Sequence, residues 1–302
     1  MSYNGWKEYR LDELVESVSV KHEFKKDKII LVNTSDVLEG KVLNHEYVKN
    51  KNLKGQFKKS FIKGDILYSE IRPKNKRFAF VDFDAKDYVA STKLMVLRRK
   101  NANIDNRYLY YVVTNERFIS ILQNLAETRS GTFPQITFNE LGMQKVKIPK
   151  LKEQKAIAHI LSTLDEKIEV NNRINKTLEN MAQAIFKHWF VDFEFPNEEG
   201  EPYKSSGGEM VESELGMIPK GWEVGTIQDI GDVVGGATPS RKIDKYFVEK
   251  GIPWITPKDL SENKNMFISR GALDITEEAY KSTSVKKMPK GTVLFSSRAP
   301  IG

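Results

Sequence analysis

The side chains of this sequence that could do chemistry are chiefly cationic, and they are most concentrated in one short stretch. Between Lys49 and Arg77 the chain carries ten lysine and arginine residues against two acids, Asp65 and Glu70. Cations at this density can neutralise the phosphates of a polyanion. They can equally form a solvated lysine-rich surface. Charge alone leaves both interpretations open.

Catalytic and metal-binding groups are sparse by comparison. The absence of cysteine excludes a disulfide framework and a thiolate metal site. The four histidines, His22, His45, His159 and His188, do not have the spacing of metal ligands. The sequence contains no Gly-x-x-x-x-Gly-Lys-Ser/Thr phosphate loop and no Asn/Asp-Pro-Pro-aromatic run. The acids around Asp82 could suggest a nuclease, but an acidic pair near a lysine is frequent by chance. We therefore expect no catalytic residue, no metal and no cofactor.

Length and charge distribution indicate two bodies separated by a spacer. A chain of 302 residues is long for one domain and suits two. Residues 1–150 carry 28 Lys and Arg against 18 Asp and Glu, residues 151–250 carry 12 against 18, and residues 251–302 carry 8 against 5. Two basic blocks on an acidic spacer suggest two places that hold a polyanion. With no long apolar run and no secretory signal, we expect a cytoplasmic protein without a membrane span.

The two basic blocks also repeat one another. "GWKEYRLDEL" (5–14) matches "GWEVGTIQDI" (221–230), "IILVNTSDV" (29–37) matches "IPWITPKDL" (252–260), and "KGDILYSEIRP" (63–73) matches "KGTVLFSSRAP" (290–300). The three matches occur in the same order, which indicates a duplicated domain. Thr292–Phe295 reads as a buried strand. The second copy therefore is expected to be truncated at Gly302, with Trp6 and Trp222 as core anchors of the two copies.

The segment between the copies has a helical period. Apolar residues separated by four and three positions continue through residues 153–190, as in a coiled coil. The expected seam positions are Ile157, Leu161, Leu164, Ile168, Asn171, Asn175, Leu178, Ala182, Ile185 and Trp189. The two asparagines either fix the register of a paired helix or mark a stretch that faces solvent. A helix of this length, roughly 55 Å, needs a partner, and pairing with a second copy of the chain is one possibility.

These patterns together predict an α+β protein of four segments. We expect a mixed β-sheet domain over residues 1–149, a long helix over 150–195, an exposed linker over 196–218, and an incomplete second copy of the first domain over 219–302. The linker is predicted from the polar, glycine-rich and acidic run that follows Pro196.

The order of these segments resembles the specificity subunit of type I restriction–modification systems. Residues 148–196 are similar to that family's central conserved region, from the EQ-x-x-I start at Glu153 to the finish "WFVDFEFP". The paired Gly-Trp openings, the run "GGATPSR…IPWITPKDL" and the two "KG" strands resemble its two target-recognition domains. "SGTFPQIT" (130–137) resembles the loop before the conserved helix.

The resemblance implies a function without catalysis in this chain. Each target-recognition domain would read one half of a split sequence in double-stranded DNA, and the long helix would set the spacing and dock modification subunits. S-adenosylmethionine would belong to those subunits, and ATP and magnesium to the restriction subunit of the complex. The incomplete second domain leaves two other possibilities, a silent-cassette copy without function and a stand-alone DNA-modifying enzyme.

DNA recognition requires cations for phosphates and short polar or guanidinium side chains for base edges. The candidates are Lys54, Lys58, Lys59, Lys63, Arg72, Lys74, Lys76, Arg77, Ser130, Thr132 and Gln135 in the first domain, and Thr238, Ser240, Arg241, Lys258 and Arg298 in the second. The four lysines from Lys54 to Lys63 are expected on phosphates. Arg72 or Arg77 is the preferred contact to guanine. Each could also be an ordinary surface residue.

Overall fold

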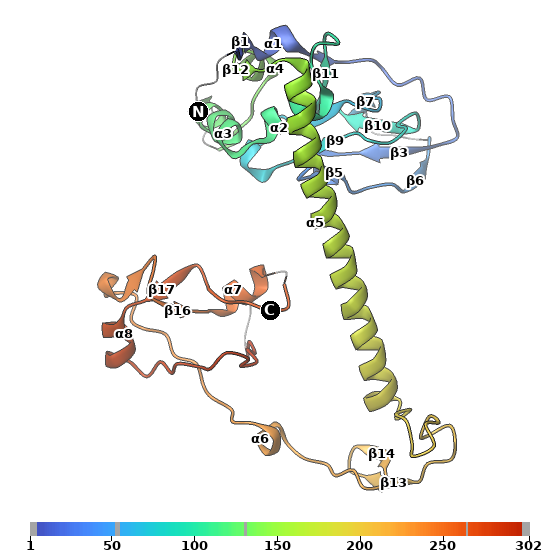
Figure 1. The fold of residues 1–302 in the computed structure, drawn as a ribbon, viewed down its shortest axis with the longest axis vertical. Helices are drawn as coiled ribbons and strands as arrows, with labels where there is room; N and C mark the ends of the chain where they lie inside the picture. The colour runs from blue at the N-terminus through green and yellow to red at the C-terminus, as the bar shows by residue number, and fades with distance from the viewer. Residues whose placement is uncertain (1–4, 52–54, 130–131, 264, 298–302) are drawn as a thin grey trace. The chain divides into compact units, whose positions relative to one another are not determined.

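A computed structural model describes residues 5–51, 55–129, 132–263 and 265–297. The chain divides into two compact units between Ile185 and Phe186, and each unit is described by itself. Figure 1 shows the sheet-rich first unit with its long helix, and the smaller elements of the second.

Over its described residues, the first unit contains two four-stranded sheets and two smaller, two-stranded pairings. The first sheet has the strand order β2-β11-β8-β9, and the second has the order β6-β3-β10-β7. Their strands are β2 (Val15–Val18), β3 (Lys28–Val32), β6 (Tyr47–Lys49), β7 (Phe57–Lys59), β8 (Ile66–Ser69), β9 (Phe78–Phe80), β10 (Tyr88–Ser91) and β11 (Leu94–Arg99). β1 (Lys7–Arg10) pairs with β12 (Lys145–Ile148), and β4 (Val37–Leu38) with β5 (Lys41–Val42). Because β10 and β3 run parallel while the other pairs are antiparallel, the predicted mixed sheet is confirmed.

The sheet that contains β8 forms the middle layer of this unit. Successive side chains of a strand point to opposite faces, and in β8 both faces are buried. Ile66 and Tyr68 pack into one apolar cluster, together with residues of the helices, whereas Leu67 packs into another with Val32 and Ala90 of the second sheet. The helices of this unit are α1 (Leu11–Leu14), α2 (Asn106–Thr114), α3 (Glu116–Arg129), α4 (Phe138–Gly142) and α5 (Leu151–Phe186). A 3₁₀ turn, η1, covers Thr34–Asp36.

The long helix α5 is joined to the rest of the first unit along one face of its first half. Gln154 and Ala158 are buried there, and Trp6 Nε1 donates to Glu153 Oε1 at 2.9 Å. Farther along, Tyr111 Oη donates to Asp165 Oδ2 at 2.6 Å, and Lys41 pairs with Glu169 at 3.0 Å. Residues three to four apart share a helix face, so these contacts fix the direction in which α5 leaves the domain.

The second unit begins with the end of the helix, which continues as a π-helix over Lys187–Val191. A hairpin of β13 (Met210–Ser213) and β14 (Gly216–Pro219) follows, and then an antiparallel sheet of order β15-β17-β16. The other elements of the second unit, with the three strands of this sheet, are α6 (Ile227–Ile230), η4 (Asp244–Tyr246), β15 (Phe247–Val248), β16 (Ile252–Trp254), α7 (Pro257–Glu262), β17 (Leu273–Ile275) and α8 (Glu277–Ser282). The hairpin shows that the predicted linker, 196–218, is structured at its end.

Two of the three matched segments have similar local structure in both copies of the repeat. α6 lies at the positions that match α1, and β16 at those that match β3. A side-chain capping box begins the turn after each strand: the Asn33 N–H donates to Asp36 Oδ2 at 2.7 Å, and the Thr256 N–H donates to Asp259 Oδ2 at 2.8 Å. Asn33 and Thr256 are separated by the offset that separates the matched sequences. A repeated cap at a repeated position supports the duplication.

The expected strand Thr292–Phe295 is wrong, because this segment has no regular structure. Tyr68 is 1% exposed in β8, whereas its counterpart Phe295 is 93% exposed. Likewise Leu11 is 0% and its counterpart Ile227 is 73% exposed. In the first copy β8 is held between β9 and β11, whereas no strand of the described residues pairs with Thr292–Phe295. A strand without neighbours has nothing to satisfy its backbone groups.

The two tryptophans of the repeat are not the core anchors that the sequence predicted. Trp6 is half-buried and contacts the first turn of α5. Trp222 stacks on Phe195 at a centroid distance of 5.5 Å and meets Phe193 edge-on at 5.5 Å. Phe195 in turn stacks on Tyr203 at 4.7 Å. The "WFVDFEFP" aromatics therefore pack against the opening residues of the second copy.

Candidate nucleic-acid interface

Two segments that the sequence treats as separate candidates form one surface in the first unit. The loop after β8 and the loop before α4 meet at an antiparallel bridge between Ile71 and Gln135. On either side of the bridge, the Ile136 N–H donates to the Glu70 carbonyl at 2.8 Å and the Arg72 N–H donates to the Pro134 carbonyl at 3.1 Å. Backbone pairing thus joins the predicted contact residues Arg72 and Gln135 across a long sequence separation.

Arg72 occupies a strained backbone conformation at this junction. It has φ 43° and ψ 79°, and it precedes the single 3₁₀ turn η2 (Pro73–Asn75), which Lys76 closes with φ 53°. Non-glycine residues at positive φ cost of order 1–3 kcal/mol and persist where the surroundings enforce them. Here the Lys76 N–H donates to the Pro73 carbonyl at 2.9 Å. The turn holds the exposed guanidinium of Arg72 and ammonium of Lys74 on a rigid loop.

Lys93 completes the junction, although no sequence motif marks it as a candidate. Its Nζ donates to Gln135 Oε1 at 3.1 Å and to Glu70 Oε2 at 3.5 Å. It therefore ties the turn before β11 to both loops. The positive charge of Lys93 and the amide of Gln135 lie together at this surface, where a base edge or phosphate could meet both.

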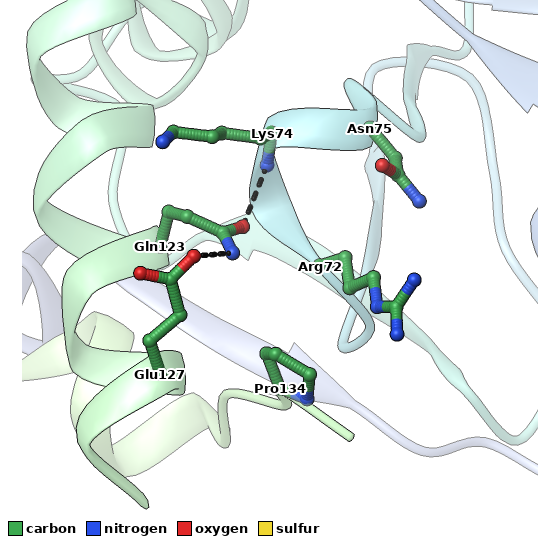
Figure 2. Close-up of a pocket in the computed structure, with 6 residues that line it drawn as sticks. All are labelled: Arg72, Lys74, Asn75, Gln123, Glu127 and Pro134. Atoms are coloured by element: carbon green, nitrogen blue, oxygen red, sulfur yellow. Dashed lines mark hydrogen bonds between the residues drawn. The ribbon is translucent and has the colours of Figure 1, made fainter. Parts of the chain in front are cut away.

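A cavity of about 530 Å³ opens between this loop and α3. Its lining residues are Arg72, Lys74, Asn75, Gln123, Glu127 and Pro134. Figure 2 shows Gln123 and Glu127 on the helix facing the loop that carries the first three. Gln123 is buried, its Oε1 accepts from the Lys74 N–H at 3.0 Å, and its Nε2 donates to Glu127 Oε1 at 2.7 Å. Neither helix residue was among the predicted candidates, because a polar pair at i, i+4 on a helix has no distinctive pattern.

Three of the predicted DNA-contacting cations are paired with other groups of the first unit. Lys59 is half-buried and donates to the carbonyls of Thr92 and Leu94 at 2.9 and 2.8 Å, and burial lowers its pKa. Arg77 donates to the Ser35 carbonyl at 2.9 Å. Lys76 pairs with Glu116 at 2.5 Å. For these three residues the contacts favour a structural role over the predicted phosphate and guanine contacts.

The remaining predicted residues are distributed over more than one surface. Lys58 and Lys63 are exposed, and neither forms an ion pair with another described residue. Lys63 precedes β8 whereas Arg72 follows it, so these two cations lie at opposite ends of the strand. Thr132 is exposed and its carbonyl accepts from Arg72 Nη2 at 3.4 Å. Lys54, Ser130 and Arg298 lie outside the described residues.

The candidates of the second unit are exposed around β16. Thr238, Ser240 and Arg241 follow one another on the segment before η4. Trp254 Nε1 donates to the Ala237 carbonyl at 3.4 Å and connects this segment to the strand. Lys258 pairs with Glu262 one helical turn later at 3.6 Å. Among the described residues, no contact selects one of them as a base reader.

The helix α5 exposes the apolar stripe that its period predicts. Ile157 and Leu161 are half-buried, and the other seam positions from Leu164 onward are exposed, including Asn171 and Asn175. Three further exposed residues widen the stripe: Ile160, Ile174 and Met181. Each precedes a predicted seam position by one residue, so apolar surface continues beside Asn175. The stripe offers a surface for another helix.

In the described ranges, no group of three or more His, Asp or Glu side chains is arranged to hold a metal ion. Within those ranges, no helix combines the length and the apolar character that crossing a bilayer requires.

Comparison with known proteins identifies the family. The family described as "Type I restriction modification DNA specificity domain" matches residues 3–180 and 219–302. The chain is 34% identical to the type I restriction enzyme HindI specificity subunit of Haemophilus influenzae, over 99% of this chain and 75% of that protein. This chain belongs to the type I restriction–modification specificity family. The predicted resemblance is confirmed.

One further sequence relative and one solved structure match different shares of this specificity protein. It is 54% identical over 94 residues to the MjaIX specificity subunit of Methanocaldococcus jannaschii, which covers 31% of this chain and 22% of that protein. The crystal structure of the HsdS subunit from Thermoanaerobacter tengcongensis superposes with a TM-score of 0.50 at 18% identity, over 83% of this chain and 60% of that one. This likeness supports the α+β fold with a long helix. The chain thus spans only part of its relatives' length.

Proposed function

We propose that this specificity protein reads one half of a split DNA sequence with its first domain and holds modification subunits along α5. The observation that carries the proposal is the junction of the two loops, where the Ile71–Gln135 bridge places Arg72, Lys74, Gln135 and Lys93 on one surface. Donor-bearing side chains on loops fixed to a buried sheet are suited to base readout, and the lysines to phosphate contact.

The long helix supplies the second part of the proposal. Its first half is fixed to the recognition domain by Gln154, Asp165 and Glu169, and its second half exposes an apolar stripe. A rigid arm with an apolar face can set the distance to a second recognition domain and dock a helical partner. We propose that modification subunits bind here, or that a second copy of the chain pairs through the stripe.

Catalysis in this proposal belongs to the partner subunits. Those subunits would bring S-adenosylmethionine, and a restriction subunit would bring ATP and magnesium, in the cytoplasm. The specificity protein contributes recognition, spacing and assembly. No observation on the described residues favours the two other possibilities, a stand-alone DNA-modifying enzyme or a silent copy.

Adenine-methylation mapping tests the proposal directly. DNA would be sequenced from cells that express this chain with its cognate modification subunit, beside the same subunit with an intact specificity subunit as a positive control. A split palindromic motif would mean that two first domains act together. A split asymmetric motif would mean that a different domain reads the second half. Absence of methylation with a competent modification subunit would refute the proposal and support a silent copy.

A further inference from the structure

The carboxylate of Glu127 lies on the surface that we propose contacts DNA, where a negative charge does not favour binding. It lines the same cavity as Arg72 and Lys74, and a carboxylate there repels phosphates. Glu127 also lies in the last turn of α3, where the negative end of the helix dipole disfavours an acid. No ion pair joins it to another described residue. Neither the helix nor an ion pair in the described ranges explains an acid at this position.

The structure nevertheless holds this carboxylate in place. Gln123 is 5% exposed, and its two amide atoms bridge the Lys74 backbone N–H and Glu127 Oε1. A buried amide with both ends paired is fixed in orientation. One oxygen of Glu127 is therefore positioned relative to the Arg72 loop, and the other oxygen remains available to accept a hydrogen bond. Figure 2 shows this arrangement around the opening above Pro134.

The two walls of the cavity have opposite hydrogen-bonding capacity. Arg72 and Lys74 only donate, whereas the ionised Glu127 only accepts. In the major groove guanine presents two acceptors and thymine one, while cytosine N4 and adenine N6 present donors. A carboxylate rejects a position that offers only acceptors and accepts an amine. A G·C pair satisfies both walls, with guanine toward Arg72 and the cytosine amine toward Glu127.

We infer that Glu127, positioned by Gln123, selects a base that presents an exocyclic amine in the major groove, cytosine or adenine, at one position of the half-site read by the first domain. This inference rests on the proposed function, because it requires that the domain contacts DNA. Glu127 is a specificity residue in this scheme, and Gln123 is its positioning residue. Cytosine and adenine share the required amine, and the substitution experiment distinguishes them.

The test compares methylation motifs of complexes that contain wild-type chain, Glu127→Gln or Glu127→Ala. Glu46→Gln serves as the matched control, because Glu46 is another exposed acid of the same unit and its replacement removes the same charge. If the base is cytosine, Glu127→Gln admits adenine there, because glutamine pairs with adenine N6 and N7. If the base is adenine, Glu127→Gln keeps it and only Glu127→Ala loses it. In the variant that changes, Glu127→Gln for cytosine or Glu127→Ala for adenine, we expect the base preference at one position to change about tenfold.

The remaining positions of the motif serve as the internal control for folding and assembly. An unchanged motif in both variants would overturn the inference. A uniform gain or loss of methylation at all sites, without a change of preference, would also overturn it, since that is the effect of charge alone. A wild-type complex that produces no split motif would instead contradict the proposed function.

Discussion

Replacing Gln154 with leucine is expected to loosen the junction between α5 and the recognition domain. Gln154 is 1% exposed. Its Nε2 donates to the carbonyls of Asn103 and Pro149 at 3.0 and 2.9 Å, and its Oε1 accepts from the Asp105 N–H at 2.9 Å. Asp105 caps α2 by accepting from the Tyr108 N–H. The side chain therefore joins the start of one helix to the cap of another.

The size of the effect follows from the three contacts. Leucine fills a similar volume but leaves two carbonyls and one N–H of the backbone without this partner. An unpaired buried polar group costs about 1–3 kcal/mol. Water that enters the site can bond to these backbone groups and recover part of this cost. We therefore expect the free energy of opening this junction to fall by about 3–5 kcal/mol. Because about 1.4 kcal/mol corresponds to a factor of ten, the protection of the backbone amides at this junction against hydrogen exchange should fall on the order of 100-fold or more.

Hydrogen exchange measured by mass spectrometry on the intact chain is the appropriate assay, because it reports local opening in a molecule of two units. The informative peptides cover 103–114 and 151–160. Gln183→Leu is the matched control, since Gln183 is exposed on the same helix, and such a change stays within about 0.5 kcal/mol. If both variants exchange at the wild-type rate in these peptides, the reasoning about Gln154 is refuted.

Three further predictions concern the same unit. Lys58→Met should lower the salt slope of DNA binding by about one without loss of stability. Lys59→Met should instead cost about 1–3 kcal/mol of stability and leave the salt slope unchanged. The reverse pattern would contradict the roles assigned to these two lysines. Tyr111→Phe, which removes the bond to Asp165, should cost about 1 kcal/mol in a double-mutant cycle with Asp165→Asn, and additive effects would mean that the two residues do not interact. Burial lowers the pKa of His22 below its ordinary 6.5, so the unfolded chain binds more protons. Stability should therefore decline as pH falls from above 6.5 through the folded pKa, and a thermal-melting series in which His22→Gln declines equally would contradict this.

Sequence alone was sufficient where the signal is periodic or repeated. The heptad of α5 depends only on residue spacing, and helix formation follows from it. The signal for the duplication is also carried by residues close in sequence, because the caps at Asn33 and at Thr256 each use a side chain three residues away. The same approach failed at Thr292–Phe295. A strand is stabilised by neighbours distant in sequence, and its composition cannot show whether they are present.

The individual binding residues could not be predicted because their roles depend on orientation and on distant partners. Lys58 and Lys59 are the same residue type and adjacent, yet alternation along β7 exposes one and directs the other toward the Thr92 and Leu94 carbonyls. Composition cannot separate them. By residue type Arg77 could read guanine, but its Nη1 donates to the backbone carbonyls of Ser35 and Val37.

What the sequence by itself determined is the family, the duplicated architecture and the long helix, since motifs and periods are properties of order along the chain. Only the tertiary structure decided that the loops carrying Arg72 and Gln135 form one surface, because their bridge joins residues far apart in sequence. It also decided that Gln123 and Glu127 face that surface from α3. Hydrogen bonds of this kind require two backbones to be brought together by a packed core, and no local pattern encodes that meeting.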